Sequence, residues 1–483
     1  MKPDAMAPSA QPRPVWRRVG VWVCALAGLA AGGLWWAVEG GWPAPPGSAT
    51  TAATESSSTS TSAPVSTQQT ASGLQAEASM TAVSNTAVLS GTEVRAGAYL
   101  AVLGNCAGCH TAPGGAAYAG GRAIPTPFGN VYAGNLTPDA ETGLGRWTTD
   151  EFWRALHEGR SRDGRRLIPA FPYTAYTHLT RQDSDRLFAY LRSLPPVPQA
   201  QRPHELRYPF GTQPALAVWQ WLSLSPAPAV QAAVHKPTPV AQGGPPAAAP
   251  QDPVARGAYL VQTLGHCAEC HAPRNRWGVL GAEMTGGVMP GHNWYAPSLH
   301  PSPTPNSHRW TAQDLVDVLR TGRHRHGSAS GPMAGVVFRS TQYWTEADLQ
   351  AAAAYLLALP ERPAAQGLGR TSSDPPAPES AALGQRLYAD QCAECHGDQG
   401  QGTPVLYSPL AGNPSVTQPD IRNLVQKLQH GGFAPATQGN PRPFGMPPQE
   451  LSVAETTAVL NHLRQSWGHR ASVVSDLEVT RVR

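Results

Sequence analysis

The sequence predicts a mainly α-helical protein in which three tandem domains follow a single N-terminal transmembrane helix. Three observations support this fold class. The pentapeptide Cys-x-x-Cys-His occurs three times, the segments around its first two copies repeat each other, and an uncharged apolar run stands near the N-terminus. The 483 residues are enough for three domains of about 100 to 150 residues with linkers between them.

The three pentapeptides have the spacing of a c-type haem attachment site. Their two thiols bond to two fixed points on the rigid porphyrin, and the histidine that follows binds its iron. A four-thiolate zinc site or a redox dithiol would not explain why a histidine follows every pair. The sequence therefore predicts three covalently bound haem c groups in cytochrome c-like domains. The predicted attachment residues are Cys106, Cys109, Cys267, Cys270, Cys392 and Cys395, and the predicted iron ligands are His110, His271 and His396.

The beginning of the chain predicts a membrane segment. Basic residues in the first 18 positions precede an apolar run over residues 19–38, and 20 residues of helix at 1.5 Å per residue span about 30 Å of hydrocarbon. The positive flank favours a cytoplasmic position for residues 1–18. We expect the haem domains on the periplasmic side of a bacterial inner membrane, with residues 19–38 either a retained anchor or a cleaved signal.

The domain boundaries follow from composition and from the repeat. Gly97–Leu100 is identical to Gly257–Leu260, and Trp147-Thr148 recurs as Trp310-Thr311. An apolar segment after the first domain is expected to form a short helix that lies on the membrane or a partner, or packs between domains. The expected organisation is a flexible linker over 39–90, domains over 91–198, 252–362 and 378–470, linkers over 199–251 (with the apolar segment) and 363–377, and a tail over 471–483.

Within each domain, the order helix, haem motif, loop, helix, loop, helix is expected. Phe152, Ala155 and Leu156 share one face at helical spacing in the first domain, as do Leu315, Val318 and Leu319 in the second. Thr148 and Thr311 can cap these helices. Glycines before the three haem motifs would permit close crossing of the first and last helices of each domain, at Gly97, Gly257 and Gly384.

The second iron ligand is expected to be methionine in two of the domains, because a thioether raises the reduction potential of haem. Met446 lies between prolines in a rigid loop well after His396. Met333 follows Ser330-Gly331-Pro332 in the second domain. Met284 and Met289 lie closer to the second haem motif, and we expect both to pack in the core.

The first domain departs from this pattern, because no methionine lies between His110 and Met284. Phe171 occupies the place equivalent to Met333, and phenylalanine cannot bind iron. A vacant or water-bound position and a histidine ligand are the alternatives, with histidine candidates at His157, His178 and His204. We expect this haem to differ from the other two in potential or spin state.

Composition and charge limit the classes of function that the chain could have. A net charge of +4 and the absence of a basic cluster do not favour nucleic-acid binding. Three one-electron groups predict an electron-transfer protein that is not an enzyme by itself. The alternatives are a peroxidase-like haem enzyme using an open first haem, a haem-based sensor, and a subunit of a terminal oxidase.

Residues of about 91 to 470 resemble the membrane-anchored three-haem cytochrome c subunits of bacterial periplasmic dehydrogenases. The resemblance is carried by the haem motifs and by four other segments, at 97–100, 169–173, 331–342 and 439–448. It implies a dehydrogenase catalytic subunit as partner, either a quinoprotein, a flavoprotein or a molybdenum and iron–sulfur protein. It also implies electron delivery to ubiquinone or a terminal oxidase. In the alcohol and gluconate branches of this family the position of Phe171 is typically methionine, so Phe171 favours the branch of molybdenum hydroxylases such as nicotinate, isoquinoline or aldehyde dehydrogenase.

Overall fold

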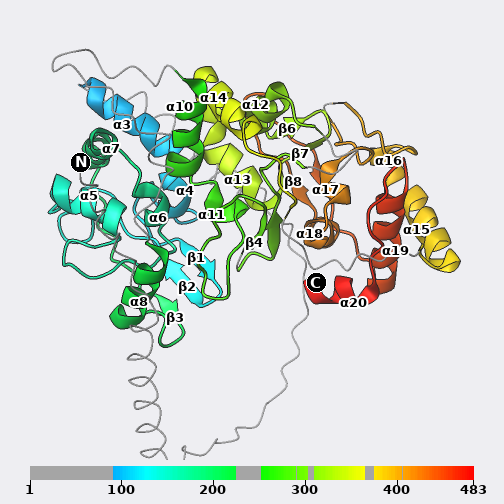
Figure 1. Ribbon diagram of the computed structural model, residues 1–483, viewed down its shortest axis with the longest axis horizontal. Helices are drawn as coiled ribbons and strands as arrows, with labels where there is room; N and C mark the ends of the chain where they lie inside the picture. The colour runs from blue at the N-terminus through cyan, green and yellow to red at the C-terminus, as the bar shows by residue number, and fades with distance from the viewer. Residues whose placement is uncertain (1–90, 225–251, 290, 303–308, 365–374, 405) are drawn as a thin grey trace, which may run out of the picture. The chain divides into compact units, whose positions relative to one another are not determined.

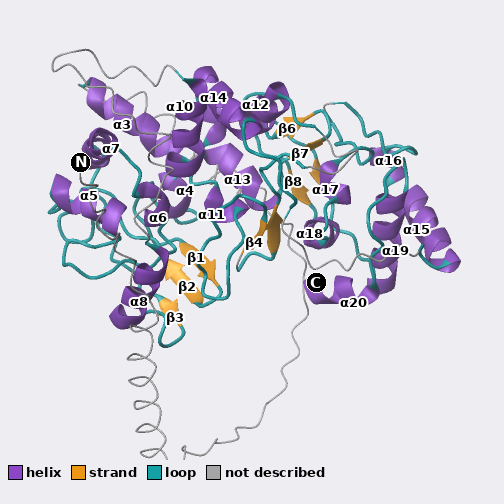
Figure 2. Cartoon of the chain, viewed as in Figure 1, coloured by secondary structure: helices purple, strands orange, loops and turns teal. Residues whose placement is uncertain are grey.

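A computed structural model describes residues 91–224, 252–289, 291–302, 309–364, 375–404 and 406–483. The described part is rich in helices, with short antiparallel strands between them (Figure 2). The segments predicted as cytoplasmic, transmembrane and flexible, over residues 1–18, 19–38 and 39–90, lie outside the described residues. Among the helices of the described ranges, none has the length and apolar character needed to cross a membrane.

The first domain has the predicted order of helices around its haem motif. A three-stranded antiparallel sheet of β1, β2 and β3 follows the motif, and α8 comes after the sheet. The elements are α3 (Thr92–Leu103), α4 (Cys106–His110), β1 (Ala123–Thr126), β2 (Gly129–Tyr132), α5 (Thr149–Glu158), α6 (Tyr173–Tyr176), α7 (Arg181–Arg192), β3 (Glu205–Leu206) and α8 (Gln213–Ser223).

The second domain repeats this order with shorter strands, whereas in the third domain the strands follow the middle helix. In the second domain the first helix continues into a π-helical turn before the haem motif. Its elements are α10 (Pro253–Ala258), η1 (Tyr259–Leu264), α11 (Ala268–His271), β4 (Gly287–Met289), β5 (Trp294–Ala296), α12 (Ala312–Thr321), β6 (Arg323–His324), β7 (Gly327–Ser328), α13 (Gly331–Arg339), η2 (Thr341–Tyr343) and α14 (Glu346–Leu357). Those of the third are α15 (Pro378–Gln391), α16 (Ala393–His396), α17 (Pro414–Thr417), α18 (Arg422–His430), β8 (Gly432–Phe433), β9 (Gly445–Met446), α19 (Val453–Gln465) and α20 (Asp476–Val482).

The first and last helices cross closely in every domain, as α3 with α7, α10 with α14 and α15 with α19 (Figure 1). The predicted glycines lie at these crossings. A Cβ on Gly97 would overlap the carbonyl of Arg186, and one on Gly257 would overlap the carbonyl of Ala351. Gly384 has the same relation to the carbonyl of Ala458. These contacts confirm that each crossing needs a residue without a side chain.

The middle helices have the predicted caps and largely the predicted faces. Thr148 and Thr311 each accept a hydrogen bond from the third helical residue in a capping box. The predicted apolar face of α5 is buried. In α12 Val316 is the fully buried apolar residue, while Leu315 and Leu319 are partly buried. Helix α12 packs on α14, and the carbonyl of its last residue, Thr321, accepts a hydrogen bond from Thr437 of the third domain.

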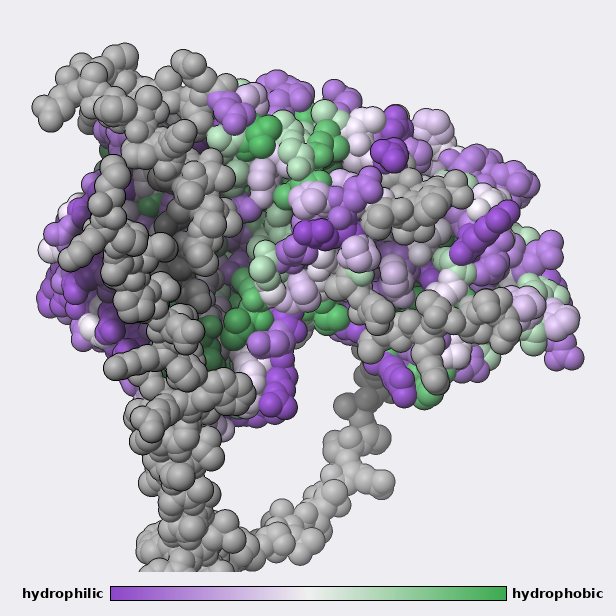
Figure 3. Space-filling view, in the orientation of Figure 1, coloured by the Kyte–Doolittle hydropathy of each residue, from purple (hydrophilic) through white to green (hydrophobic). Residues whose placement is uncertain are grey.

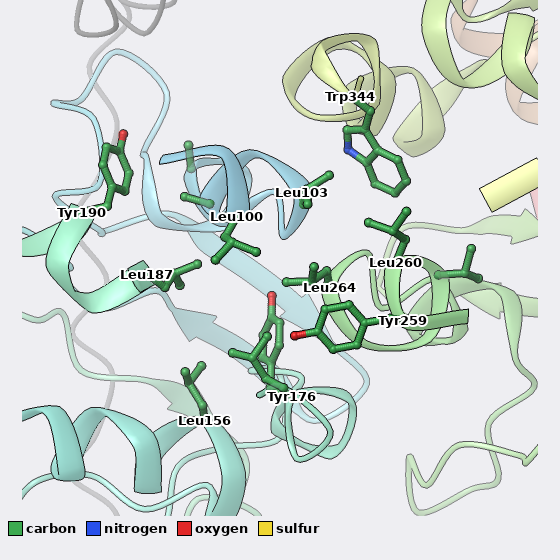
Figure 4. Packing of buried hydrophobic residues seen from close by; sticks show 14 of the residues in the cluster. Leu100, Leu103, Leu156, Tyr176, Leu187, Tyr190, Tyr259, Leu260, Leu264 and Trp344 are labelled. Atoms are coloured by element: carbon green, nitrogen blue, oxygen red, sulfur yellow. The ribbon is translucent and has the colours of Figure 1, made fainter. Parts of the chain in front are cut away.

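One hydrophobic core joins the first two domains, and a second core lies within the third. In the shared core, Leu100 and Leu103 of α3 lie near Leu260 and Leu264 of η1, with Trp344 at one edge (Figure 4). On the face shown in Figure 3, hydrophobic residues gather where α10 and α14 lie. The first two domains therefore pack as one unit.

Two reciprocal contacts tie the first domain to the second. The Tyr99 hydroxyl of α3 donates to Asp348 Oδ2 at 2.7 Å, at the start of α14. The Tyr259 hydroxyl of η1 donates to Asp183 Oδ2 at 2.7 Å, at the start of α7. Tyr99 and Tyr259 occupy equivalent positions in the repeat. The two domains therefore contact each other through equivalent surfaces, as the subunits of an isologous dimer do.

The C-terminal residues belong to the third core. Residues 471–483, expected to form a tail, include α20, which buries Val479 and Val482 against α18 and α19. Buried Arg464 holds the turn between α19 and α20 in place. Its guanidinium donates to the carbonyls of Val416 and Ser472 at 2.8 and 2.9 Å.

Candidate haem-binding sites

Each haem motif forms one short helical turn after the first helix of its domain. The residues before the first two motifs, Asn105 and His266, have φ angles of 48° and 38°, a left-handed conformation that turns the chain into the motif. The cysteines of each motif lie within one turn of each other, because the backbone N–H of the second donates to the carbonyl of the first in the second and third motifs, for example from Cys270 to Cys267 at 3.2 Å.

The three motif histidines have the same hydrogen-bonding arrangement. The Nδ1–H group of His110 donates to a backbone carbonyl at 2.7 Å, that of His271 at 2.7 Å and that of His396 at 3.1 Å. Each ring makes no other hydrogen bond within the described residues, so Nε2 is left for a metal. Such a bond at Nδ1 fixes the tautomer and ring orientation of a metal-binding histidine. The acceptors are the carbonyls of Gly134, Pro297 and Ser408.

These three acceptors leave no signal in the sequence. They are backbone oxygens, which any residue type supplies, and they lie at unequal distances along the chain from their histidines. Only the folded loops bring them beside the rings.

The first cysteine of each motif is held in the neutral form. Burial raises the pKa of Cys106 and Cys267 to about 12 and that of Cys392 to about 11. A reactive dithiol needs a lowered thiol pKa, and these surroundings do the opposite. A neutral, buried sulfur suits the thioether that joins cysteine to haem. Burial also lowers the pKa of His110 and His271, which favours the neutral imidazole that binds iron.

The two predicted methionine ligands lie in short elements that follow the middle helices of their domains. Met446 is in β9, pairs with Gly432 and packs on the third core. Met333 is in the first turn of α13, whose Gly331 lies against the ring of Trp294. Met284 is buried in the shared core, as predicted, and partly buried Met289 pairs with Trp294 across β4 and β5. The roles of Met333 and Met446 as iron ligands stay predictions.

In the first domain Phe171 packs among aromatic rings. Its ring centroid lies 5.7 Å from that of Tyr176 and 6.3 Å from that of Tyr173. His157 is occupied elsewhere, because its ring nitrogens lie 2.8 and 3.0 Å from the carbonyls of Leu179 and Trp153.

Two other histidines were candidates for the first iron. His204 Nδ1 accepts a hydrogen bond from the backbone N–H of Tyr132 at 3.1 Å. His178 also has an interaction partner. The described contacts therefore give no support to His157 as a ligand, and they engage one ring nitrogen of His204.

The first two haem motifs face each other across the interface of their domains. His266 Nε2–H donates to the carbonyl of Gly104, just before the first motif, at 3.3 Å. Helix α13 of the second domain also contacts α4, which carries the first motif.

Comparison with known proteins agrees with this geometry. The family model for cytochrome c matches residues 94–195 and 381–467. The chain is 36% identical over 408 residues to the cytochrome c subunit of a quinone alcohol dehydrogenase from Gluconacetobacter polyoxogenes, covering 81% of this chain and 84% of that one. The chain belongs to the family of cytochrome c subunits of bacterial dehydrogenases. This membership fits the oriented histidines and neutral sulfurs, and it identifies the chain as an electron-transfer protein rather than a catalytic subunit.

Relatives in this cytochrome c family serve different dehydrogenases. The gluconate 2-dehydrogenase cytochrome c subunit of Pantoea cypripedii is 34% identical over 396 residues, with 78% of this chain and 86% of that one covered. A nicotinate dehydrogenase subunit of Pseudomonas putida is 38% identical over 392 residues, with 76% of this chain but 30% of that longer one covered.

Proposed function

We propose that the chain carries three covalent haem c groups and relays single electrons from a dehydrogenase catalytic subunit into the respiratory chain. The observation that carries this proposal is the threefold recurrence of one site. In each copy, two cysteines precede a histidine whose Nδ1 is bonded to a carbonyl and whose Nε2 is left for iron. Haem iron, when bound, supplies a one-electron carrier. The names of the relatives support the dehydrogenase partner.

The distal ligands complete the proposal. Met333 and Met446 would be the second iron ligands of the second and third sites. Met333 lies in the first turn of α13, and Met446 packs on the third core. In the first site Phe171 takes this place within its aromatic cluster. For the first site we propose that the iron would keep an open or water-bound position, because Phe171 cannot bind it and the rings of His157 and His204 bond to backbone groups. His178 is the alternative ligand.

The proposed location is the outer face of a bacterial inner membrane. The support is the apolar run over residues 19–38 with its basic flank, together with haem attachment, which takes place outside the cytoplasm. Delivery of electrons to ubiquinone or to a terminal oxidase follows from this location.

One residue of this chain, Phe171, indicates the class of the catalytic subunit. Quinoprotein, flavoprotein and molybdenum iron–sulfur partners are all compatible with the relatives. Phe171, where a methionine would be expected for the alcohol and gluconate type, favours the molybdenum iron–sulfur class.

Purification from native membranes in mild detergent tests the proposal. The expected result is a complex in which this chain accompanies a dehydrogenase subunit, and in which the substrate of that subunit, added without oxygen, reduces the haem absorption bands. Molybdenum and iron–sulfur clusters in the partner would support the assignment based on Phe171. A chain that purifies alone, or a partner whose substrate leaves the haems oxidised, would contradict the relay.

A further inference from the structure

Helix α8 exposes a row of apolar side chains. Pro214, Val218, Trp221 and Leu222 recur at helical spacing on its exposed side. The exposed fractions are 58% for Val218, 80% for Trp221 and 51% for Leu222. Leu216 and Gln220 are its buried residues. The exposed side of a surface helix is usually polar, so this apolar row is unusual.

The polar side chains of α8 attach it to the first domain. The Gln213 side chain accepts from the backbone N–H of Arg166 at 2.7 Å and donates to its carbonyl at 3.2 Å. Seven residues later, Gln220 Nε2 donates to the carbonyls of Glu158 and Gly159 at 3.4 and 3.3 Å. The helix is thus held at two points, and the apolar side is left facing outward.

The apolar surface continues onto the second domain. Trp219 Nε1–H donates to the carbonyl of Trp277 at 3.1 Å, and the ring of Trp277 is 51% exposed. The ring of Phe128 packs on Phe210 at a centroid distance of 4.3 Å and lies beside Gly278. These contacts join the segment 206–224 to the loop after the second haem motif.

Arginines lie beside the exposed rings of this surface. Segments 206–224 and 270–282 contain arginines and no carboxylate, although Glu205, Glu269 and Glu283 flank them. The guanidinium of Arg276 lies over the Trp277 ring at 5.0 Å, and Arg207 adjoins Tyr208, which is 88% exposed. Aromatic rings with a polar edge and arginines with long apolar stems are the side chains that favour a membrane interface.

We propose that the exposed side of α8, with Trp277 and Tyr208, lies on the lipid bilayer surface. Its apolar side chains enter the boundary of the acyl chains, as in interfacial helices, and Arg207 and Arg276 meet anionic phosphate headgroups. A lipid occupant is favoured because exposed aromatic rings beside arginines suit the headgroup boundary and because an apolar run over residues 19–38 would hold the domains near the membrane. The proposal rests on the membrane attachment proposed above.

Photocrosslinking in native membranes tests this proposal. The full-length chain carries the photoreactive residue p-benzoylphenylalanine in place of Leu222, and a matched chain carries it in place of Gln182, an exposed residue of α7. After illumination, mass spectrometry identifies what is joined to each position. Lipid adducts are expected at position 222, several-fold more abundant than at position 182.

Other outcomes would overturn the proposal. Adducts at position 222 to a dehydrogenase subunit, or to another segment of this chain, would assign a protein to the surface. Equal lipid labelling at both positions would show that contact is nonspecific. If the chain is membrane-bound but position 222 joins no lipid, only this proposal fails. If the chain is absent from membranes, the proposed attachment fails with it. Haem reduction by the dehydrogenase substrate, measured in the same preparation, reports the electron relay separately.

Discussion

Phe171 has no lone pair to offer iron, and it lies where the second domain has Met333. The surrounding rings of Tyr173 and Tyr176 hold it in an aromatic cluster. The first iron is therefore expected to accept an external ligand after reduction, unlike the other two.

The substitution Phe171→Met should supply a second protein ligand to the iron of the first haem. We expect the reduced wild-type protein to bind about one equivalent of carbon monoxide per chain, and the variant to bind almost none, because a thioether would occupy the distal position. Carbon monoxide difference spectra measure this. Phe152→Met, in the buried face of α5, is the matched control and should bind like wild type. A wild-type protein that binds no carbon monoxide would rule out the open position.

Ionisation of His266 makes the free energy of unfolding depend on pH. Burial lowers its pKa, and the charge of Glu269 raises it to a smaller extent. Because the folded protein disfavours the protonated ring, the contribution of His266 is present above the unfolded pKa of about 6.5 and is lost as the pH falls below it.

The variant His266→Asn tests the direction of this pH dependence. Asparagine tolerates the left-handed backbone, as Asn105 does at the equivalent position. We expect a cost of about 1 kcal/mol at pH 8 from the lost hydrogen bond to Gly104, and a smaller difference from wild type at pH 5. Denaturation midpoints at the two pH values measure it. A difference that grows toward low pH would contradict the assignment.

At the scale of elements, the helix crossings follow from the position of one glycine in each domain. Gly97→Ala, Gly257→Ala and Gly384→Ala should each destabilise the protein by about 1 to 3 kcal/mol or more, since each added methyl group meets a backbone carbonyl that cannot move alone. Thermal unfolding followed by circular dichroism measures this. Gly335→Ala is the control: its added Cβ meets only the end of the flexible Arg339 side chain, and it should be neutral or slightly stabilising. Equal effects at all four positions would show that the crossings do not depend on glycine.

The elements also show what a sequence can predict. Helix caps and crossing glycines were predictable because their chemistry is local or depends on one residue type. The carbonyls that hold His110, His271 and His396 were not, since backbone oxygens carry no residue signature. The burial of residues 471–483 was also missed, because the core that Val479 joins is formed by helices distant in sequence.

At the scale of the whole molecule, the first two domains are joined by equivalent residues. Burial raises the pKa of Tyr99 to about 12, and the Asp348 carboxylate adds to this effect, so the hydroxyl remains a donor at physiological pH. Arg256 donates to the same carboxylate at 2.8 Å.

Removing the two hydroxyls should loosen this interface. Tyr99→Phe and Tyr259→Phe are each expected to cost about 1 kcal/mol, and the double variant about the sum, because the contacts share no partner. Denaturant midpoints followed through the haem absorption measure the loss. Tyr208→Phe, at an exposed position, should leave the midpoint unchanged. If only one of the two variants is destabilised, the contacts are not equivalent.

The central claim is that one chain holds three haems, two in a joined pair of domains and one in a third. Mass spectrometry of the intact mature protein and of its peptides tests it most directly. The account predicts three covalent haem additions, one each on the peptides containing Cys106, Cys267 and Cys392. A protein with only two haem additions, in which one of the three cysteine pairs is unmodified, would contradict it.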